Sequence, residues 1–229
     1  MENTKNSAKK SISYSRTKSN AEKVTLIMIR HGETTANVRR INQGQIGGTL
    51  TKKGISQSKR AGLELRNKKI DEFYISDLKR TRDTAEKIIE YHKDAKIIYA
   101  KDLREQKLGI LENSRQGKED ALLKGLKEID FRPKNGESLK DMCNRVNRYR
   151  ERIVNEKLEE SRRTHKDITV VIITHGGPIV CLLMGITGKT EKNRKGLKKF
   201  LPKNTAISTI NIYQKDFKIL KINSTRHLK

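Results

Sequence analysis

The sequence predicts an α/β protein of three layers, in which helices cover both faces of a mostly parallel central sheet and a small insertion forms a cap. Two observations lead to this fold class. Apolar, β-branched runs alternate with amphipathic helical patterns along the chain. Two of these runs, residues 24–29 and 168–174, are apolar on both faces, which is typical of buried strands in a parallel sheet.

The individual elements follow from the spacing of apolar residues and from turn residues. Helices are predicted at residues 51–67, 78–92, 139–163 and 178–186. Strands are predicted at residues 24–29, 73–75, 97–99, 168–174, 205–213 and 217–222. We expect the last two strands to form an antiparallel pair. The long helix at 139–163 carries an apolar stripe that includes Met142, Val146 and Tyr149, so one of its faces should pack on the core.

The length favours one domain. A chain of 229 residues fits one compact domain with a modest insertion better than two full domains. Residues 1–23 are rich in Ser, Asn and Lys and poor in apolar side chains, so we expect a flexible basic tail there. The domain then covers residues 24–229. Its cap-like insertion covers about residues 108–138, where several glycines and Pro133 interrupt the pattern.

The charge is strongly positive. The chain has 52 basic and 27 acidic residues, for a net charge of +25. Because this excess is spread along the chain, a Lys-rich solvated surface is the first interpretation, and attraction of phosphate-bearing substrates is the second. The basic run at 192–199 is consistent both with a solvated surface and with attraction of anionic substrates. No aromatic residues interleave with the basic ones, so we do not expect nucleic acid as a partner. The oligomeric state stays open.

The composition also bears on location. The longest apolar stretch is broken by polar residues and glycines at 174–177, so no run of about 20 apolar residues is available for a membrane span, and we expect no membrane partner. The first residues lack the apolar core of a secretory signal. Two cysteines, Cys143 and Cys181, suit a reducing compartment better than a disulfide framework. These features predict a cytoplasmic protein.

Two of the predicted strands end in a histidine followed by a glycine, at His31 and His175. In open α/β sheets, ligands bind outside the carboxyl ends of the strands, so the two imidazoles are expected to meet there. Arg30 adds a permanent planar cation, and Gly32 allows backbone N–H groups to approach an anion. These are the requirements of a phosphate site.

Two further segments supply charged groups. Arg80 lies where the strand at 73–75 turns into a helix that Ser76 or Asp77 could cap, and a helix N-terminus attracts anions. Glu105 places a carboxylate after the strand at 97–99. The remaining histidines, at 92, 165 and 227, occupy polar contexts, and we expect them to be solvated.

Taken together, these segments resemble the histidine phosphatase superfamily, also called phosphoglycerate mutase-like, over about residues 24–213. The motifs that carry the resemblance are Arg30-His31-Gly32-Glu33-Thr34 with Asn37, Gln43-Gly44, Leu50-Thr51, residues 76–85, Leu103-Arg104-Glu105 with Gly109 and Glu112, Gly136-Glu137-Ser138, and residues 171–176. The resemblance implies the three-layer fold of that family and a phosphatase domain at 24–229. It also implies hydrolysis of a phosphomonoester through a phosphohistidine.

The resemblance assigns a role to each matching residue. His31 would attack phosphorus, and Glu105 would protonate the leaving oxygen and then activate water. The groups that would hold the phosphoryl oxygens and the substrate are Arg30, Arg80, His175, Asn37, Gln43, Gly44 and the Gly176 backbone. Attack requires one neutral nitrogen on His31, so its other nitrogen should donate to a carbonyl near Gly32. No metal and no other cofactor is expected, since an arginine clamp can replace a metal.

Departures from the family pattern narrow the function. Gln106, Lys107 and Leu108 stand where mutases of this family have an Arg-His-Tyr run, and Arg115 is the one arginine where the mutase cap has a pair. This favours a phosphatase acting on a small phosphorylated metabolite, such as a sugar phosphate or bisphosphate. Two alternatives stay open: a cofactor-dependent phosphoglycerate mutase, and a catalytically weak relative that binds polyanions. Residues 47–49 and Asn113 also depart from the family pattern, which leaves loop geometry and specificity open.

Overall fold

The computed structural model describes residues 22–116, 128–189 and 198–229. The described strands form one sheet in the order β3-β2-β4-β1-β5-β6. Their bounds are β1 Val24–Arg30, β2 Glu72–Ser76, β3 Lys96–Ala100, β4 Ile168–Thr174, β5 Ile207–Ile212 and β6 Phe217–Ser224. Strands β1 to β4 run parallel, whereas β5 pairs antiparallel with both β1 and β6. The prediction of a mostly parallel sheet with a terminal antiparallel pair is therefore confirmed.

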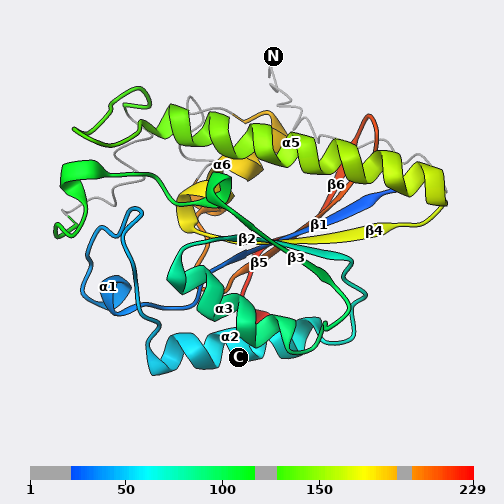
Figure 1. The fold of residues 1–229 in the computed structure, drawn as a ribbon, viewed down its shortest axis with the longest axis horizontal. Coiled ribbons are helices and arrows are strands. Elements are labelled where there is room, and N and C mark those ends of the chain that lie inside the picture. Colours follow the sequence, from blue (N-terminus) through cyan, green and yellow to red (C-terminus); the bar gives the residue numbers. More distant parts are fainter. Residues whose placement is uncertain (1–21, 117–127, 190–197) are drawn as a thin grey trace, which may run out of the picture.

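Helices cover both faces of this sheet (Figure 1). Helices α5 (Leu139–Thr164) and α6 (Gly176–Thr187) lie on one face, and α2 (Lys52–Leu65) and α3 (Lys79–Ile89) lie on the other. One apolar cluster lies between the sheet and helices α5 and α6, and a second lies between the sheet and helices α2 and α3. The predicted stripe of α5 is buried, including Met142, Val146 and Tyr149. This arrangement confirms the three-layer fold.

The centre of the sheet sets the position of the site. Strands β1 and β4 pair in parallel register from Val24 opposite Ile168 to Arg30 opposite Thr174. Because the two strands start and end together, the residues that follow them leave the sheet at the same edge. His31 and His175 are those residues.

Local signals explain where the helices begin. Ser138 caps α5 by accepting from the Asp141 N–H, and the Asp141 carboxylate accepts from the Ser138 N–H in return. Helix α6 starts at Gly176, two residues before the predicted start, which places Pro178 in its first turn, where proline is tolerated. Helix α3 starts at Lys79 without a side-chain cap, so the expected cap by Ser76 or Asp77 is wrong.

Short helical turns complete the described chain. They are α1 (Thr35–Val38) and the 3₁₀ turns η1 (Lys101–Leu103), η2 (Gly109–Leu111), η4 (Lys198–Phe200) and η5 (Arg226–Leu228). The described part of the insertion pairs with the loop after α1, since the Asn42 N–H donates to the Ser114 carbonyl and the Asn113 N–H donates to the Asn42 carbonyl. The basic tail up to residue 21, insertion residues 117–127 and most of the basic run at 192–199 lie outside the described residues.

Two expectations about individual side chains are wrong. Cys143 of α5 and Cys181 of α6 form a disulfide, although the presence of only two cysteines had suggested a reducing compartment and not a disulfide framework. Packing of α5 against α6 brings their Cα atoms to 5.0 Å, a proximity that sequence spacing does not reveal. His92 is buried and its ring lies 5.7 Å from the Phe73 ring, because the turn after α3 folds back onto the core. Among the described helices, none combines the length and the apolar run that a membrane crossing needs.

Candidate active site

The two histidines meet at the carboxyl edge of the sheet. The ring centroids of His31 and His175 are 5.3 Å apart, and both side chains are almost fully buried. The register of β1 and β4 produces this proximity across 144 residues of sequence. The predicted convergence of the two strand ends is therefore present in the structure.

Hydrogen bonding fixes the tautomer of His31. Its Nδ1 lies 2.8 Å from the Gly32 carbonyl oxygen, and because a carbonyl only accepts, Nδ1 carries the proton. Burial, together with the nearby guanidiniums of Arg80 and Arg30, lowers the pKa of His31 well below 6.5. The ring is thus neutral at pH 7, with the Nε2 lone pair available. The expected bond to a carbonyl near Gly32 has this geometry.

Gly32 has a different role from the one expected. Its N–H donates to the Thr84 hydroxyl at 2.9 Å, so this N–H is not left for an anion. A Cβ at Gly32 would lie 2.6 Å from the Gly54 carbonyl oxygen of α2. The close approach of α2 therefore requires a glycine here, and Gly32 does not line the cavity described below.

Arg80 is the largest fully buried side chain of the described chain. Its guanidinium donates to the Gly44 and Ile46 carbonyls, both at 2.8 Å, and to Nδ1 of His175 at 3.1 Å. Burial and the neighbouring Arg30 lower the pKa of Arg80 to about 10, so it stays charged at pH 7. Three protein acceptors fix the orientation of the guanidinium, and further N–H groups are left for a bound anion.

His175 is fixed through both of its ring nitrogens. Arg80 Nε always donates, so Nδ1 of His175 is an acceptor, and Nε2 then carries the proton and donates to the Ser76 hydroxyl at 2.8 Å. Burial and the charge of Arg80 lower the pKa of His175 well below 6.5. In this state His175 lies behind Arg80 and does not line the cavity.

Arg30 forms the other cationic wall. Its NH1 donates to the Pro202 carbonyl at 2.8 Å, which joins the end of β1 to the segment before β5. Gly176, the first residue of α6, lies beside this guanidinium, and a Cβ there would make only an ordinary contact, 3.7 Å from Arg30 Cζ. Arg30 and the start of α6 thus border the cavity together.

Glu105 supplies the carboxylate. One of its oxygens accepts from the Gln106 N–H at 3.0 Å, and the other accepts from the Gly177 N–H at 3.2 Å. A Cβ at Gly177 would displace this carboxylate, because it would lie 2.3 Å from Glu105 Oε1 and 2.8 Å from the Met142 methyl. The acid is therefore held against the first turn of α6.

These groups border one cavity that encloses about 650 Å³ of space, part of it open solvent. The predicted site residues that line it are Arg30, His31, Asn37, Gln43, Gly44, Arg80, Glu105 and Gly176. Gln43 is buried, and its Oε1 has no hydrogen-bond partner within the described chain. Asn37 Oδ1 accepts from Thr34 N–H and from Asn204, so its amide N–H groups are left to donate.

The sequence motifs did not identify every residue of the site. Further cavity residues are Ile41, Asn42, Gln106, Leu108, Gln116, Gly177 and Leu201. Gln106 and Leu108 had been noted only as departures from a family pattern, and Gln116 and Leu201 lie outside every motif. Ser76 had been assigned to a helix cap, whereas its hydroxyl contacts His175. Residues of this kind could be found only from the tertiary contacts.

The arrangement suits phosphoryl transfer. Two guanidiniums can hold phosphoryl oxygens, a neutral imidazole offers a lone pair, and a carboxylate lies at the same cavity. Within the described ranges, no group of three or more His, Cys, Asp or Glu side chains is placed to bind a metal ion.

Similar proteins agree with this chemistry. The profile of the histidine phosphatase superfamily, branch 1, matches residues 26–225. A metal-independent phosphoserine phosphatase of Arabidopsis thaliana is 30% identical over 179 residues, which cover 73% of this chain and 70% of that protein. A probable phosphoglycerate mutase of Escherichia coli is 33% identical over 167 residues, which cover 70% of this chain and 74% of that protein. The solved structure of a mycobacterial glucosyl-3-phosphoglycerate phosphatase has a TM-score of 0.76 at 24% identity, covers 88% of this chain and 99% of its own, and supports the fold.

Proposed function

This chain belongs to the histidine phosphatase superfamily, branch 1, and is a phosphatase of small phosphorylated metabolites; on that premise we propose that it works through a phosphohistidine formed on His31. In the first step Nε2 of His31 attacks phosphorus, the bond from phosphorus to the leaving oxygen breaks, and Glu105 gives its proton to that oxygen. In the second step Glu105 takes a proton from water, which attacks phosphorus and releases phosphate from His31.

The charges around the cavity support this sequence of steps. The transferring phosphoryl group carries negative charge on its equatorial oxygens, which Arg30 and Arg80 are positioned to stabilise. His175 orients Arg80 through its Nδ1 acceptor. Asn37, Gln43, Gly44 and the Gly176 N–H complete the proposed binding set.

One observation carries the proposal: the Nδ1–H of His31 is committed to the Gly32 carbonyl, which leaves Nε2 as the nucleophile. The test is hydrolysis of para-nitrophenyl phosphate by the purified chain and by His31→Asn, an amide that cannot accept a phosphoryl group in the same way. We expect the substitution to abolish turnover while the far-ultraviolet circular dichroism is unchanged. Retained turnover in the variant would reject His31 as the nucleophile.

We propose that the reaction needs no metal. The two arginines supply the positive charge that a metal would otherwise provide, and the similar protein of Arabidopsis thaliana is described as metal-independent. Activity should be the same before and after incubation with EDTA. A loss of activity that Mg²⁺ or Zn²⁺ restores would contradict this proposal.

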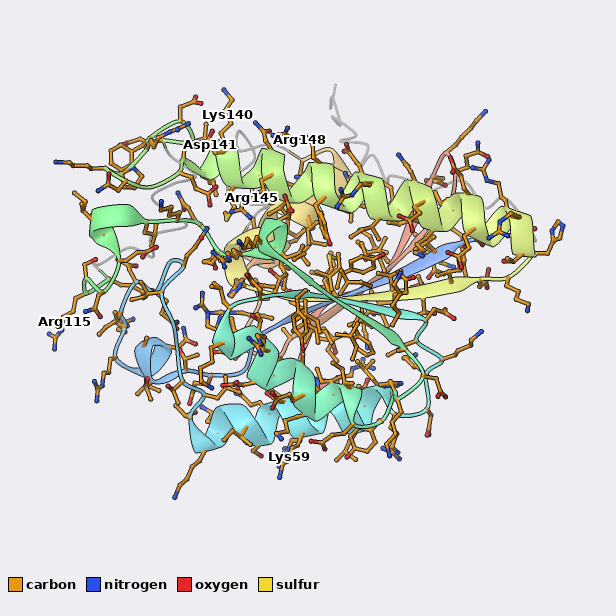
Figure 2. All side chains as sticks on the ribbon, viewed as in Figure 1. Lys59, Arg115, Lys140, Asp141, Arg145 and Arg148 are labelled. Atoms are coloured by element: carbon orange, nitrogen blue, oxygen red, sulfur yellow. A yellow bond between two sulfur atoms is a disulfide. The ribbon has the colours of Figure 1, made fainter. Side chains whose placement is uncertain are left out.

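The lining of the cavity also points to a substrate class. Beyond Arg30, Arg80 and Glu105, the described lining is uncharged and includes the amides of Asn42, Gln106 and Gln116 and the apolar side chains of Ile41, Leu108 and Leu201. Of the two arginines in the described part of the cap, Arg115 points away from the body of the protein (Figure 2), and Arg132 forms an ion pair with Asp141. We propose that the leaving group is uncharged and carries hydroxyl groups, as in a sugar monophosphate.

A panel of phosphomonoesters tests this class. Sugar monophosphates should have higher kcat/KM than phosphoglycerates or sugar bisphosphates, because the described lining offers no cation to a second anionic group. The same panel tests the mutase alternative, which the Escherichia coli relative favours by its name. Interconversion of phosphoglycerates without release of phosphate would support the mutase. Strong, salt-sensitive binding of nucleic acid without turnover would support the polyanion-binding alternative.

We propose a cytoplasmic location. Because the cytosol keeps thiols reduced, this proposal requires that the Cys143–Cys181 disulfide of the structure is opened in the cell. Contacts other than the bond hold the two helices together, including the donation from the Asn147 amide to the Cys181 carbonyl at 3.1 Å. Alkylation of thiols in freshly lysed cells should therefore modify both cysteines after denaturation. A fully oxidised pair at that stage would argue for another compartment.

A further inference from the structure

The proposed general acid lies on a segment without regular structure. Residues 104–108 connect η1 to η2, and no helix or strand fixes them. Within the described residues, the Glu105 side chain accepts hydrogen bonds from two backbone N–H groups, those of Gln106 and Gly177. The position of its carboxylate therefore depends on whatever holds the backbone on either side of it.

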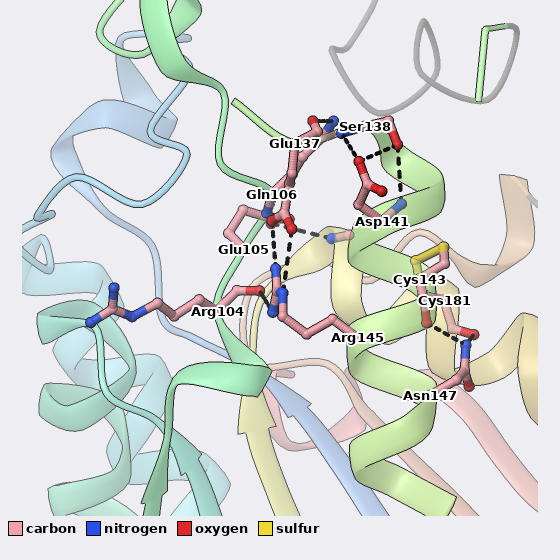
Figure 3. The surroundings of a disulfide bond; sticks show 11 residues. Arg104, Glu105, Gln106, Glu137, Ser138, Asp141, Cys143, Arg145, Asn147 and Cys181 are labelled. Atoms are coloured by element: carbon pink, nitrogen blue, oxygen red, sulfur yellow. Dashed lines mark hydrogen bonds and ion pairs between the residues drawn. A yellow bond between two sulfur atoms is a disulfide. The ribbon is translucent and has the colours of Figure 1, made fainter. Parts of the chain in front are cut away.

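Arg145 of α5 holds the side that precedes Glu105 (Figure 3). Its NH1 donates to the Asp102 carbonyl at 2.7 Å and to the Arg104 carbonyl at 3.2 Å. Its Nε and NH2 donate to the two carboxylate oxygens of Glu137, at 3.3 and 2.5 Å. A single guanidinium thus joins the turn before the acid to Glu137.

Glu137 holds the side that follows Glu105. Its carboxylate accepts from the Lys107 N–H at 2.9 Å, and its own N–H donates to the Lys107 carbonyl at 2.8 Å. The Gln106 amide donates to the Glu137 carbonyl at 2.9 Å. The residues on both sides of Glu105 are therefore attached to one ion pair, whose side chains are only 21% and 18% exposed.

The start of α5 does not depend on this ion pair. Ser138 and Asp141 close their own cap, and Arg145 lies two turns further along the helix. Loss of the pair should therefore leave the start of the helix folded. The segment that carries the acid would keep the bond from the Gln45 amide to the Glu105 carbonyl and the Arg104–Asp77 ion pair, but it would lose its attachment to α5.

We propose that Glu137 and Arg145 are positioning residues for catalysis, which keep the Glu105 carboxyl where it can protonate the leaving oxygen. This inference rests on the proposed role of Glu105. It predicts a specific signature: substitution of Arg145 slows substrates whose leaving group needs a proton and spares those whose leaving group departs as a stable anion. A purely structural role would slow both kinds alike.

The test compares two substrates and two variants. Glycerol 2-phosphate has a poor leaving group, and para-nitrophenyl phosphate has a good one. For Arg145→Gln, kcat/KM for glycerol 2-phosphate should fall by about tenfold to a hundredfold, part of the effect of a general acid, while kcat/KM for para-nitrophenyl phosphate should change by less than about threefold. Glu137→Gln should behave in the same way and serves if Arg145→Gln does not fold.

Two controls make the outcome decisive. Arg148 is exposed and lies on the outer face of the same helix (Figure 2), so Arg148→Gln should leave both substrates unchanged. In the double variant Glu105→Gln/Arg145→Gln, the second substitution should have no further effect on glycerol 2-phosphate, because the acid is already gone. Equal losses on both substrates, or additive effects in the double variant, would overturn the inference. If Glu105→Gln alone hydrolyses glycerol 2-phosphate normally, the proposed role of Glu105 fails instead.

Discussion

The buried, neutral state of His31 should be visible in the pH dependence of stability. Its folded pKa lies well below 6.5 because burial and two arginines oppose its charge. Between the folded and unfolded pKa values, unfolding takes up a proton, so the free energy of unfolding falls as pH drops below 6.5. The slope is about 1.4 kcal/mol per pH unit for one such histidine. If His31 stays neutral in the folded protein across this window, it alone lowers the free energy of unfolding by about 2 kcal/mol between about pH 7 and pH 5.

The assay is urea unfolding followed by circular dichroism, since the chain has no Trp to report by fluorescence. Wild type and His31→Asn are compared at both pH values without phosphate. Wild type should lose about 2 kcal/mol more than the variant. His175, His92 and His227 also have lowered pKa values, but they contribute to both proteins. Carboxylates with lowered pKa values, such as Asp77, change the free energy of unfolding only below the range of pH 5 to pH 7 that is compared. Equal losses in the two proteins would refute a buried, neutral His31.

Three further predictions concern other parts of the site. Gly177→Ala places a Cβ 2.3 Å from Glu105 Oε1, so kcat/KM for glycerol 2-phosphate should fall by about a hundredfold or more. Helix α6 should stay folded, because alanine has a higher helix propensity than glycine. An unchanged rate would show that the carboxylate is not held there. Arg80→Lys loses the fork that contacts Gly44, Ile46 and His175, and kcat should fall about a hundredfold to a thousandfold, measured with para-nitrophenyl phosphate. Gly44→Ala combines a φ of +50° with a Cβ 2.2 Å from the Glu112 carboxylate, so thermal unfolding should show a loss of at least about 1 kcal/mol.

Much of the fold and the site could be predicted from the sequence because strong local signals coincide with the site. The apolar runs of β1 and β4 are unambiguous, and each ends directly before a histidine, so the edge where His31 and His175 meet follows from topology alone. The carbonyl partner of Nδ1 on His31 could be expected because a nucleophilic imidazole needs a fixed tautomer.

The failures share a physical cause, which is that packing between distant elements chooses among several local possibilities. A glycine such as Gly32 can let a backbone N–H approach an anion, or it can let a helix pack closely. The approach of α2 shows that Gly32 has the second role. Ser76 could cap α3, but the arrival of His175 from β4 gives its hydroxyl another partner. The pairing of Cys143 with Cys181 depends on how α5 crosses α6, which no local pattern encodes.

The most direct measurement is the chemical identity of the phosphoenzyme. The protein is mixed rapidly with substrate, quenched in alkali, which preserves phosphohistidine, and digested for mass spectrometry. Phosphate should be found on the peptide that contains His31, and none should be found on that peptide from His31→Asn. Phosphate on His175 instead, or no phosphoenzyme during rapid turnover, would contradict the mechanism.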